Sequence, residues 1–183
     1  VGETEAVLRQ LAPHLKPGAI ITDAGSTKMN VVAAAYAALG TRAVDFVPGH
    51  PIAGSERSGP GAARADLYRG RRVVLTPQPD TRAEALATVR ALWETTGAQV
   101  ETLDAAQHDR IFAAVSHLPH LAAFALVDDL AARADSELFF RFAASGFRDF
   151  TRIAASSPEM WRDIALANRP ALLAELDGYI AAL

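Results

Sequence analysis

His50 lies in a stretch rich in glycine and proline that directly follows an apolar run. The run, Ala43 to Val47, is typical of a buried strand, and the three glycines and two prolines between Pro48 and Gly59 predict an irregular loop after it. Open α/β sheets bind ligands at the carboxyl ends of their strands. An imidazole there can accept a proton near neutral pH, although a histidine in a loop can equally do no more than hydrogen-bond a turn.

A second polar group follows the short β-branched run from Ala19 to Asp23, which predicts another buried strand. It includes Ser26 and Thr27, and a helix is predicted to start next, from about Met29 to Leu39. A strand, a tight turn and a helix in this order aim backbone N–H groups and the helix dipole at whatever lies above the sheet. The two hydroxyls could therefore contact an anion or a polar ligand, or serve only as the helix N-cap.

Further reactive side chains lie in the second half of the chain. His117 and His120 have a spacing that predicts one helix face, and such a pair could bind zinc, but no third ligand is evident. His108 and Asp109 belong to a first helical turn, where they could orient a neighbour or simply match the helix dipole. Arg152 could bind an anion or form a surface ion pair with the aspartate three residues earlier.

The elements that would position these groups alternate between strand and helix over the first hundred residues. Strands separated by helices of 10 to 15 residues indicate right-handed crossovers and a mostly parallel sheet, so the fold class is α/β. We predict a helix capped by Thr4 and another opened by a capping box of Thr81 and Glu84. The predicted strands are 19–23, 43–47, 71–77 and 98–103.

From Asp104 onward the pattern predicts helices only, so we place a domain boundary between 1–104 and 105–183. Asp104 is predicted to cap a helix that Pro119 interrupts, at a cost of about 3 kcal/mol, and such departures are frequent at functional sites. Ser157 and Asn168 are predicted to cap the last two helices. The apolar residues of the last helix cover nearly two faces, which favours a homodimer formed through the helices.

The composition is that of a soluble globular protein. The 183 residues are 50% hydrophobic and 21% charged, enough to bury a core, and a net charge of −3 argues against nucleic acid as a partner. The absence of cysteine excludes disulfides, thiolate zinc sites and cysteine nucleophiles. Because no apolar run reaches the roughly 18 residues needed to span a bilayer and no signal sequence is evident, we predict a cytoplasmic protein without a membrane partner.

Six motifs occur in order along the chain. They are Asp-x-Gly-Ser-Thr-Lys at 23–28, His-Pro-Ile-Ala-Gly-Ser-Glu at 50–56, Leu-Thr-Pro at 75–77, Ser-His-Leu-Pro-His at 116–120, Gly-Phe-Arg-Asp-Phe-Thr-Arg-Ile-Ala at 146–154 and Pro-x-Met-Trp-Arg-Asp-Ile at 158–164. Their order and content resemble the prephenate dehydrogenase family, with its arogenate and cyclohexadienyl relatives. The resemblance implies part of a Rossmann-like nucleotide-binding domain over 1–104 and a helical substrate-binding and dimerisation domain over 105–183.

The resemblance also implies a reaction, the oxidative decarboxylation of prephenate to 4-hydroxyphenylpyruvate in tyrosine biosynthesis, with NAD or NADP as hydride acceptor. His50 would accept the proton of the substrate hydroxyl, and Ser26 would orient that hydroxyl or the nicotinamide amide. Arg152 would bind one of the two substrate carboxylates.

Other family positions imply supporting roles. His120 would lie near the substrate side chain, with His117 as its support, and Asp109 would orient a neighbouring group. Asp23 would contribute to the cofactor site together with Ser26. The resemblance further implies that the substrate cleft is lined or gated by Glu56 and Trp161, although a tryptophan is as commonly a core or interface residue.

Two features depart from the family pattern. No Gly-x-Gly-x-x-Gly occurs, so we expect about 70 to 100 residues of a first mononucleotide-binding half to be missing, and we expect the chain alone to bind the cofactor weakly or not at all and to be inactive. The residue that distinguishes NAD from NADP would lie in that half. Ser145 stands where a second glycine is expected beside Gly146, and its Cβ could narrow the cleft.

Two alternative functions stay open. Arogenate dehydrogenase would act on a substrate whose side chain carries an ammonium group, and His120 slightly favours the keto acid instead. A non-catalytic ligand-binding or dimerisation module is compatible with the absent glycine motif, but it would not need His50, Ser26, Arg152 and the paired histidines.

Overall fold

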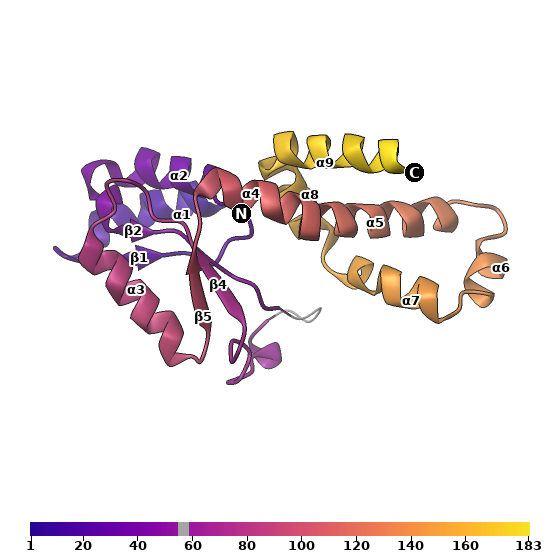
Figure 1. Ribbon diagram of the computed structural model, residues 1–183, viewed down its shortest axis with the longest axis horizontal. Helices are drawn as coiled ribbons and strands as arrows, with labels where there is room; N and C mark the ends of the chain where they lie inside the picture. The colour runs from indigo at the N-terminus through magenta and orange to yellow at the C-terminus, as the bar shows by residue number, and fades with distance from the viewer. Residues whose placement is uncertain (55–58) are drawn as a thin grey trace. The chain divides into compact units, whose positions relative to one another are not determined.

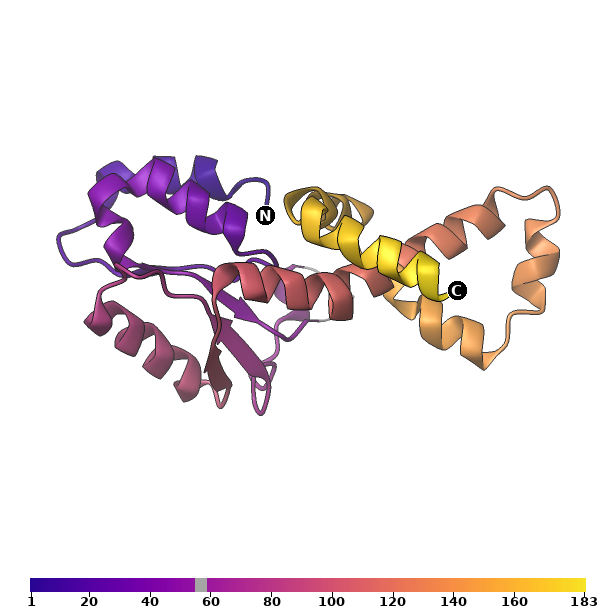
Figure 2. The same ribbon diagram turned by 45° about the horizontal axis from the view of Figure 1, so that its top comes forward.

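The computed structural model describes residues 1–54 and 59–183. It forms two compact units, Val1–Ile111 and Phe112–Leu183 (Figures 1 and 2). The first unit combines strands with helices and the second is helical, which confirms the predicted class of an α/β part followed by a helical part. The boundary predicted after residue 104 stays a prediction.

The strands of the first unit form two small sheets. In one, β1 (Ile21–Thr22) pairs in parallel with β2 (Phe46–Val47). In the other, β4 (Arg72–Leu75) lies in the middle, parallel to β5 (Gln99–Thr102) and antiparallel to β3 (Gly49–Pro51). The expected parallel pairing is therefore confirmed except at β3.

Helices cover both faces of these strands. The helices α1 (Thr4–Leu11) and α2 (Met29–Leu39) pack on one side, around a core that includes Leu8 and Val31 (Figure 1). On the other side, α3 (Ala83–Thr95) packs against the inner residues of β2 and β4. The predicted bounds of the second helix, 29–39, are confirmed, and Gly40 ends it with a backbone φ of 56°.

The strand predicted over 43–47 is shorter than expected. Only Phe46 and Val47 are extended, and the segment Gly40–Asp45 is a 3₁₀ helix. The carbonyl oxygen of Val44 accepts a hydrogen bond from the Arg82 N–H at 2.8 Å, and the carboxylate of Asp45 pairs with the same arginine. The polar groups of this segment are thus satisfied by the start of α3 and not by a neighbouring strand.

The stretch around His50 was predicted to be a loop, and that prediction is wrong at its start. After a single residue, Pro48, the chain enters β3, in which His50 lies opposite Val74. The pairing continues past the strand, because the Ile52 N–H donates to the Arg72 carbonyl at 2.8 Å. Proline at position 51 is compatible with an outer strand of a sheet, where one edge has no neighbour.

The helix caps agree only in part with the predictions. Asp104 opens α4 (Ala105–Phe112), since its carboxylate accepts from the N–H groups of the second and third following residues at 2.8 and 3.1 Å. Ser157 likewise caps α8. Thr4 instead donates to the Val1 carbonyl, and Thr81 accepts from the Gln78 N–H, so neither hydroxyl caps its helix.

The second unit contains no strand, and all of its residues are described. The backbone is helical from Ala105 to Ala131, and Ala113–His117 is a π-helical turn within it, so Pro119 lies inside a continuous helix directly after that turn. The predicted interruption at Pro119 is thus a π-helical turn, a local departure from α-helical hydrogen bonding next to a residue that has no N–H. The helices are α5 (Leu118–Ala131), α6 (Ser136–Arg141), α7 (Ser145–Thr151), α8 (Pro158–Ala167) and α9 (Arg169–Ala182).

The helical stretch Ala105–Ala131 is long and apolar enough, by length and composition alone, to cross a bilayer. This corrects the prediction that no segment reaches that length, although a core helix of a soluble protein passes the same test. Large apolar side chains of the second unit are exposed, including Val115, Phe142, Leu166 and Ile180. An apolar surface of this kind is typical of a face that another protein surface covers.

Candidate active site

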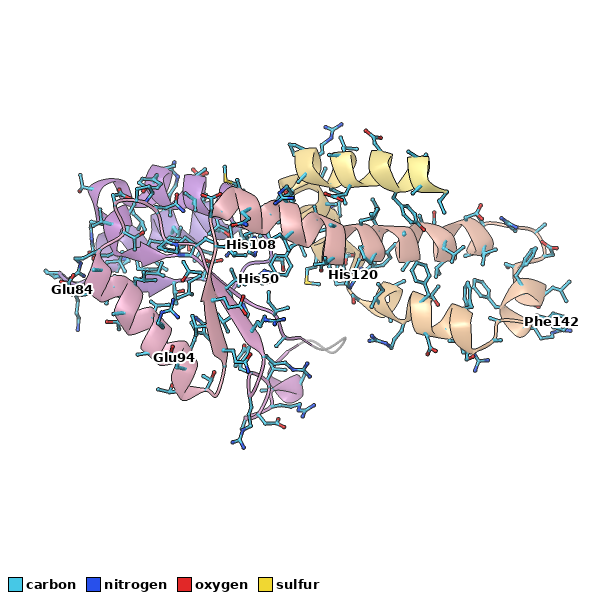
Figure 3. The ribbon with its side chains drawn as sticks, viewed as in Figure 1. His50, Glu84, Glu94, His108, His120 and Phe142 are labelled. Carbon is cyan, nitrogen blue, oxygen red and sulfur yellow. The ribbon has the colours of Figure 1, made fainter. Side chains whose placement is uncertain are left out.

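The first unit holds a chain of three titratable side chains from two elements. The Nδ1 atom of His50, on β3, lies 2.8 Å from the Nε2 atom of His108, on α4 (Figure 3). The Nδ1 atom of His108 lies 2.8 Å from the Asp109 carboxylate. His108 and Asp109 are buried, with 0% and 3% of their surfaces exposed, whereas His50 is only partly buried. His108 and Asp109 are therefore not surface groups that merely match a helix dipole.

When both rings are neutral, the hydrogen bonds assign the position of each imidazole proton. A carboxylate can only accept, so the Nδ1–H of His108 donates to Asp109 and its Nε2 carries a lone pair. That lone pair accepts the Nδ1–H of His50. The Nε2 atom of His50 is then unprotonated, as a general base requires.

Asp109 also holds the start of α2. Its two carboxylate oxygens accept the backbone N–H groups of Lys28 at 2.7 Å and Met29 at 2.9 Å, so it caps this helix from a distant part of the chain. Burial alone would raise the pKa of Asp109, but the hydrogen bonds from His108, Met29 and Lys28 outweigh it and hold this pKa below its usual range. Asp109 is therefore a carboxylate at neutral pH and stabilises positive charge on the histidine pair.

A buried ion pair lies where β1 and β2 end. The Lys28 ammonium, with 0% of its side chain exposed, lies 2.5 Å from a carboxylate oxygen of Asp23, of whose side chain 16% is exposed. Burial lowers the pKa of Lys28, and the neighbouring Asp23 opposes that shift. Asp23 also accepts the N–H groups of Gly25 and Gly49, at 2.7 and 2.9 Å.

Ser26 lies in the turn between β1 and α2, next to the residues of this ion pair. It is half-buried, and its hydroxyl makes no hydrogen bond to the residues that the structure describes. The N-cap position of α2 is Lys28, and Asp109 supplies the capping carboxylate, so Ser26 and Thr27 do not cap this helix. The hydroxyl of Thr27 instead bonds the Asn30 side chain at 2.7 Å.

The second unit holds its own group of aromatic and polar side chains. The His120 ring stacks on Trp161 with centroids 3.5 Å apart, and the edge of His117 approaches the same indole at 6.1 Å. His117 is buried, and its Nδ1 atom lies 3.1 Å from the Asn168 side-chain nitrogen. The Asn168 side chain is therefore a hydrogen-bond partner of the buried His117 and does not cap α9.

His120 is held in one tautomer by the turn that precedes it. Its Nδ1–H donates to the Ser116 carbonyl at 2.8 Å, which leaves Nε2 as an acceptor. Burial lowers the pKa of His120, and the positive charge of Arg152 lowers it further. Arg152 is exposed at the start of the short 3₁₀ segment Arg152–Ala155. Its guanidinium is close enough for its charge to affect the His120 ring.

Trp161 has a second environment. With His117, Leu121 and Phe124 it lines a cavity of about 570 Å³ in the helical unit, whose lining also includes Asp128 and Arg162. Its Nε1 atom has no hydrogen-bond partner among the described residues. Trp161 therefore both stacks on His120 and lines this cavity.

Comparison with known protein families assigns the whole chain. Residues 1–102 match the nucleotide-binding domain of prephenate dehydrogenase, and residues 104–183 match its dimerization domain. The chain belongs to the prephenate dehydrogenase family.

Relatives and solved structures of this family are similar along nearly the whole chain. Cyclohexadienyl dehydrogenase of Zymomonas mobilis is 40% identical over 97% of this chain, which covers 60% of that protein. Prephenate dehydrogenase of Bacillus subtilis is 40% identical over 98% of this chain, which covers 49% of that protein. The crystal structure of prephenate dehydrogenase from Aquifex aeolicus, with hydroxyphenyl propionate and NAD⁺, is 40% identical, with a TM-score of 0.91 over 99% of this chain and 63% of that one.

The structure brings the predicted site residues of this prephenate dehydrogenase homologue together in two groups. In the first unit, His50 is linked to Asp109, and Asp23 lies close to the Ser26 turn. In the second, His117, His120 and Trp161 form one cluster, and Arg152 acts on His120 through its charge. Glu56 lies outside the described residues.

Two residues outside the predicted set of site residues contact its members, and sequence reasoning allows one of them, His108, to orient a neighbour. His108 connects His50 to Asp109, and Lys28 supplies the buried charge beside Asp23. A signal for both was present in the sequence. His108 precedes a candidate site aspartate, and Lys28 ends the same six-residue motif as Asp23, five residues later.

Proposed function

We propose that this protein catalyses the NAD-dependent oxidative decarboxylation of prephenate to 4-hydroxyphenylpyruvate. The observation that carries the proposal is the hydrogen-bonded series from His50 through His108 to Asp109, which leaves one imidazole nitrogen as a proton acceptor. Membership of the family and the likeness to an enzyme solved with NAD⁺ support the cofactor. NADP is not distinguished from NAD by the residues of this chain.

In this reaction the C4 hydroxyl of prephenate donates its proton to Nε2 of His50. As the O–H bond breaks, C4 gives up a hydride and its oxygen becomes a carbonyl oxygen. The bond between the ring and its carboxylate then breaks to release carbon dioxide, and its electron pair converts the ring and the carbonyl into a phenolate, which takes the proton back from His50. NAD, when bound, supplies the acceptor for the hydride. The ring becomes aromatic, which provides the driving force of the reaction.

The protonated His50 is stabilised by the groups behind it. Its Nδ1–H continues to donate to His108, whose own Nδ1–H donates to the Asp109 carboxylate. The negative charge of Asp109 therefore favours the imidazolium, and the two hydrogen bonds fix the ring orientation, as in other series of an acidic group, a histidine and a reacting atom. His108 and Asp109 act through His50 and are positioning residues.

Ser26 fits the cofactor side of such a site. Its half-buried hydroxyl makes no hydrogen bond to the described residues and lies at the carboxyl end of a parallel strand, where nucleotide-binding sheets hold their ligands. We assign it to the nicotinamide amide or the substrate hydroxyl. Asp23 is fully engaged by Gly25, Gly49 and Lys28, so its proposed cofactor role is indirect, through the position of the Ser26 turn.

The substrate carboxylates are assigned to the helical unit. Arg152 is exposed and carries a guanidinium that can bind a carboxylate through two parallel hydrogen bonds. His120 presents Nε2 as an acceptor beside Trp161, and His117 supports the same indole from the buried side. Ser145 is the first residue of α7, and we keep the proposal that its side chain narrows the substrate cleft.

Arogenate is the second candidate substrate, and one observation favours it. A neutral His120 with an accepting Nε2 can take a hydrogen bond from the ammonium group of arogenate, whereas a keto group offers no proton. The expected slight preference of His120 for the keto acid therefore does not follow from its tautomer. Side-by-side values of kcat/KM for prephenate and arogenate decide between them.

We also propose a homodimer formed through the helical unit, in a soluble cytoplasmic enzyme. The match to a dimerization domain supports it, as do the exposed apolar side chains of α6, α8 and α9, which include Leu138, Leu166 and Ile180. Light scattering coupled to size exclusion measures the mass in solution. Replacing Leu166 and Ile180 by glutamate is expected to yield monomers, and a wild-type monomer contradicts the proposal.

The proposed activity is tested by following NADH formation with prephenate. The assay uses the 183-residue chain, for which we expect little activity, and the longest polypeptide that its reading frame encodes, for which we expect turnover. The absence of turnover with prephenate and arogenate in both proteins, at saturating NAD and NADP, would show that the proposed reaction is wrong and would favour a non-catalytic binding module.

A further inference from the structure

The backbone of Gly49, the residue before His50, is held on both of its polar groups by one buried ion pair. Its N–H donates to the Asp23 carboxylate at 2.9 Å, and its carbonyl accepts from the Lys28 ammonium at 2.6 Å. These bonds lie at the edge of β3 that pairs with no strand among the described residues, because β4 occupies the other edge. Two side chains thus take the place of a strand beside the proposed general base.

The same ion pair also holds the turn that carries Ser26. The second oxygen of Asp23 accepts the Gly25 N–H at 2.7 Å and the Lys28 ammonium at 2.5 Å. Asp23 and Lys28 flank Ser26 in the sequence, so both ends of this turn are fixed by the groups that fix Gly49. Two polar contacts therefore tie the turn to β3, and two more hold the turn itself.

The two glycines are required for this close approach. A Cβ atom on Gly49 would lie 2.9 Å from the Asp23 backbone oxygen, and one on Gly25 would lie 2.9 Å from the Asp23 carboxylate. Contacts this short force a backbone or a buried carboxylate to move. Any other residue at either position would separate the ion pair from the backbone it holds.

We propose that Asp23 and Lys28 are positioning residues of the active site, which together set the place of His50 relative to His108 and to the Ser26 hydroxyl. Neither residue touches substrate in this assignment. The catalytic meaning of the inference rests on the proposed function, but its structural content, the alignment of the His50 and His108 rings, does not.

The decisive measurement is the scalar coupling between the two ring nitrogens that share the hydrogen bond, His50 Nδ1 and His108 Nε2, in ¹⁵N-labelled protein. The wild-type chain is expected to show this coupling, without substrate or cofactor. In the variant Asp23→Asn/Lys28→Met, which leaves no uncompensated charge, we expect the coupling to be lost while the chain stays folded. A purely structural ion pair would lower stability and leave the coupling of the folded protein unchanged.

Asp45→Asn is the matched control, because it breaks another carboxylate–cation pair of the same unit that contacts neither Gly25 nor Gly49. It is expected to keep the wild-type coupling. Gly49→Ala is an independent variant that leaves both charges in place and is expected to weaken the coupling. Lys28→Met alone removes the donor to the Gly49 carbonyl and the cation beside Asp23, while Asp23 keeps its two backbone N–H donors.

The outcomes separate this inference from the proposed function. Full coupling in a folded Asp23→Asn/Lys28→Met chain overturns the inference. The inference also fails if the double variant, Gly49→Ala and Lys28→Met all fail to fold, because the ion pair would then serve the fold as a whole. In the active enzyme, Lys28→Met is expected to lower kcat about ten- to hundredfold with little change in KM, as for a displaced catalytic group. Loss of coupling in a protein that never oxidises prephenate would support the positioning role and reject the reaction.

Discussion

The two units hold their histidines by different physical means. In the first unit, His50 and His108 are fixed by charges that are themselves buried, Asp109 on one side and the pair of Asp23 and Lys28 on the other. In the second, His120 is fixed by stacking on an indole and by one hydrogen bond to a backbone carbonyl.

This difference matches the work proposed for each unit. A general base needs a defined tautomer and a partner that stabilises its charged form, and buried carboxylates supply both. A substrate-binding histidine needs a fixed ring orientation and an accepting nitrogen. For His120, stacking on Trp161 fixes the ring and the bond to the Ser116 carbonyl leaves Nε2 as the acceptor, without a buried charge. The first unit should therefore respond to changes of charge and the second to changes of aromatic surface.

The largest effect is expected from His50. Replacing it by glutamine removes the proton acceptor, and kcat of the active enzyme should fall by about 10²- to 10⁴-fold, the usual contribution of general base catalysis. His14→Gln, in an exposed position of the first unit, is the control and should leave kcat unchanged. A His50→Gln enzyme with wild-type kcat would place the base elsewhere and break the comparison at its centre.

The next effect concerns the stability of the first unit. Asp23→Asn leaves the fully buried Lys28 ammonium without its partner and is expected to cost about 3–5 kcal/mol of unfolding free energy. Lys28→Met should cost less, because Asp23 is partly exposed and keeps two backbone N–H donors. Urea unfolding of the single and double variants measures the difference, and equal losses for the two single variants would contradict a charge-based arrangement.

Asp109 should make the stability of the first unit depend on acidity. Its pKa is below the usual range in the folded state, so its contribution is complete above the unfolded value of about 3.9 and is lost as the pH falls through the folded pKa. Asp109→Asn is expected to remove this acid dependence and to lower stability at neutral pH by about 1–3 kcal/mol, through the lost helix cap and hydrogen bonds.

Urea unfolding at several pH values tests this expectation, with Glu94→Gln, an exposed carboxylate on α3, as the control. The difference between the pH profiles of the two variants isolates the share of Asp109. If the profile of Asp109→Asn runs parallel to that of the wild type down to acidic pH, the carboxylate does not hold the network as described.

The order of strands and helices in the first unit, apart from β3, could be predicted from the sequence because it depends on local pattern. The bounds of α2 follow from its apolar spacing and from Gly40, and His50 and Trp161 lie in short motifs, while their roles remain predictions. The type of fold needed no more than the alternation of strands and helices. The arrangement of Arg152 relative to His50 remains a prediction.

What local pattern could not predict depends on contacts between distant residues. β3 is a strand only because β4 pairs with it, and glycine and proline on either side of His50 are more typical of a loop. The cap of α2 comes from Asp109, about eighty residues away, so no rule about neighbouring residues could find it. The π-helical turn before Pro119 likewise follows from how the backbone adapts and not from residue type alone.

A smaller effect is expected in the second unit. Trp161→Leu removes the ring on which His120 stacks and should cost about 0.5–1.5 kcal/mol beyond the lost apolar area. Because burial lowers the pKa of His120, removing the indole should raise this pKa toward its usual value. Histidine resonances followed by NMR over pH measure it, with Trp93→Leu of the first unit as the control, and an unchanged His120 pKa would mean that stacking does not set its environment.

The smallest effect is expected at an exposed ion pair of the first unit, which sharpens the comparison from the other side. Glu5 and Arg9 lie 2.6 Å apart on α1, about as close as Asp23 and Lys28, but their side chains are 49% and 56% exposed. Because water and salt screen such a pair, Arg9→Ala should change the unfolding free energy by no more than about 0.5 kcal/mol, and less at high salt. A loss as large as that of Asp23→Asn in urea unfolding would mean that proximity, and not burial, determines how strongly charges hold this unit together.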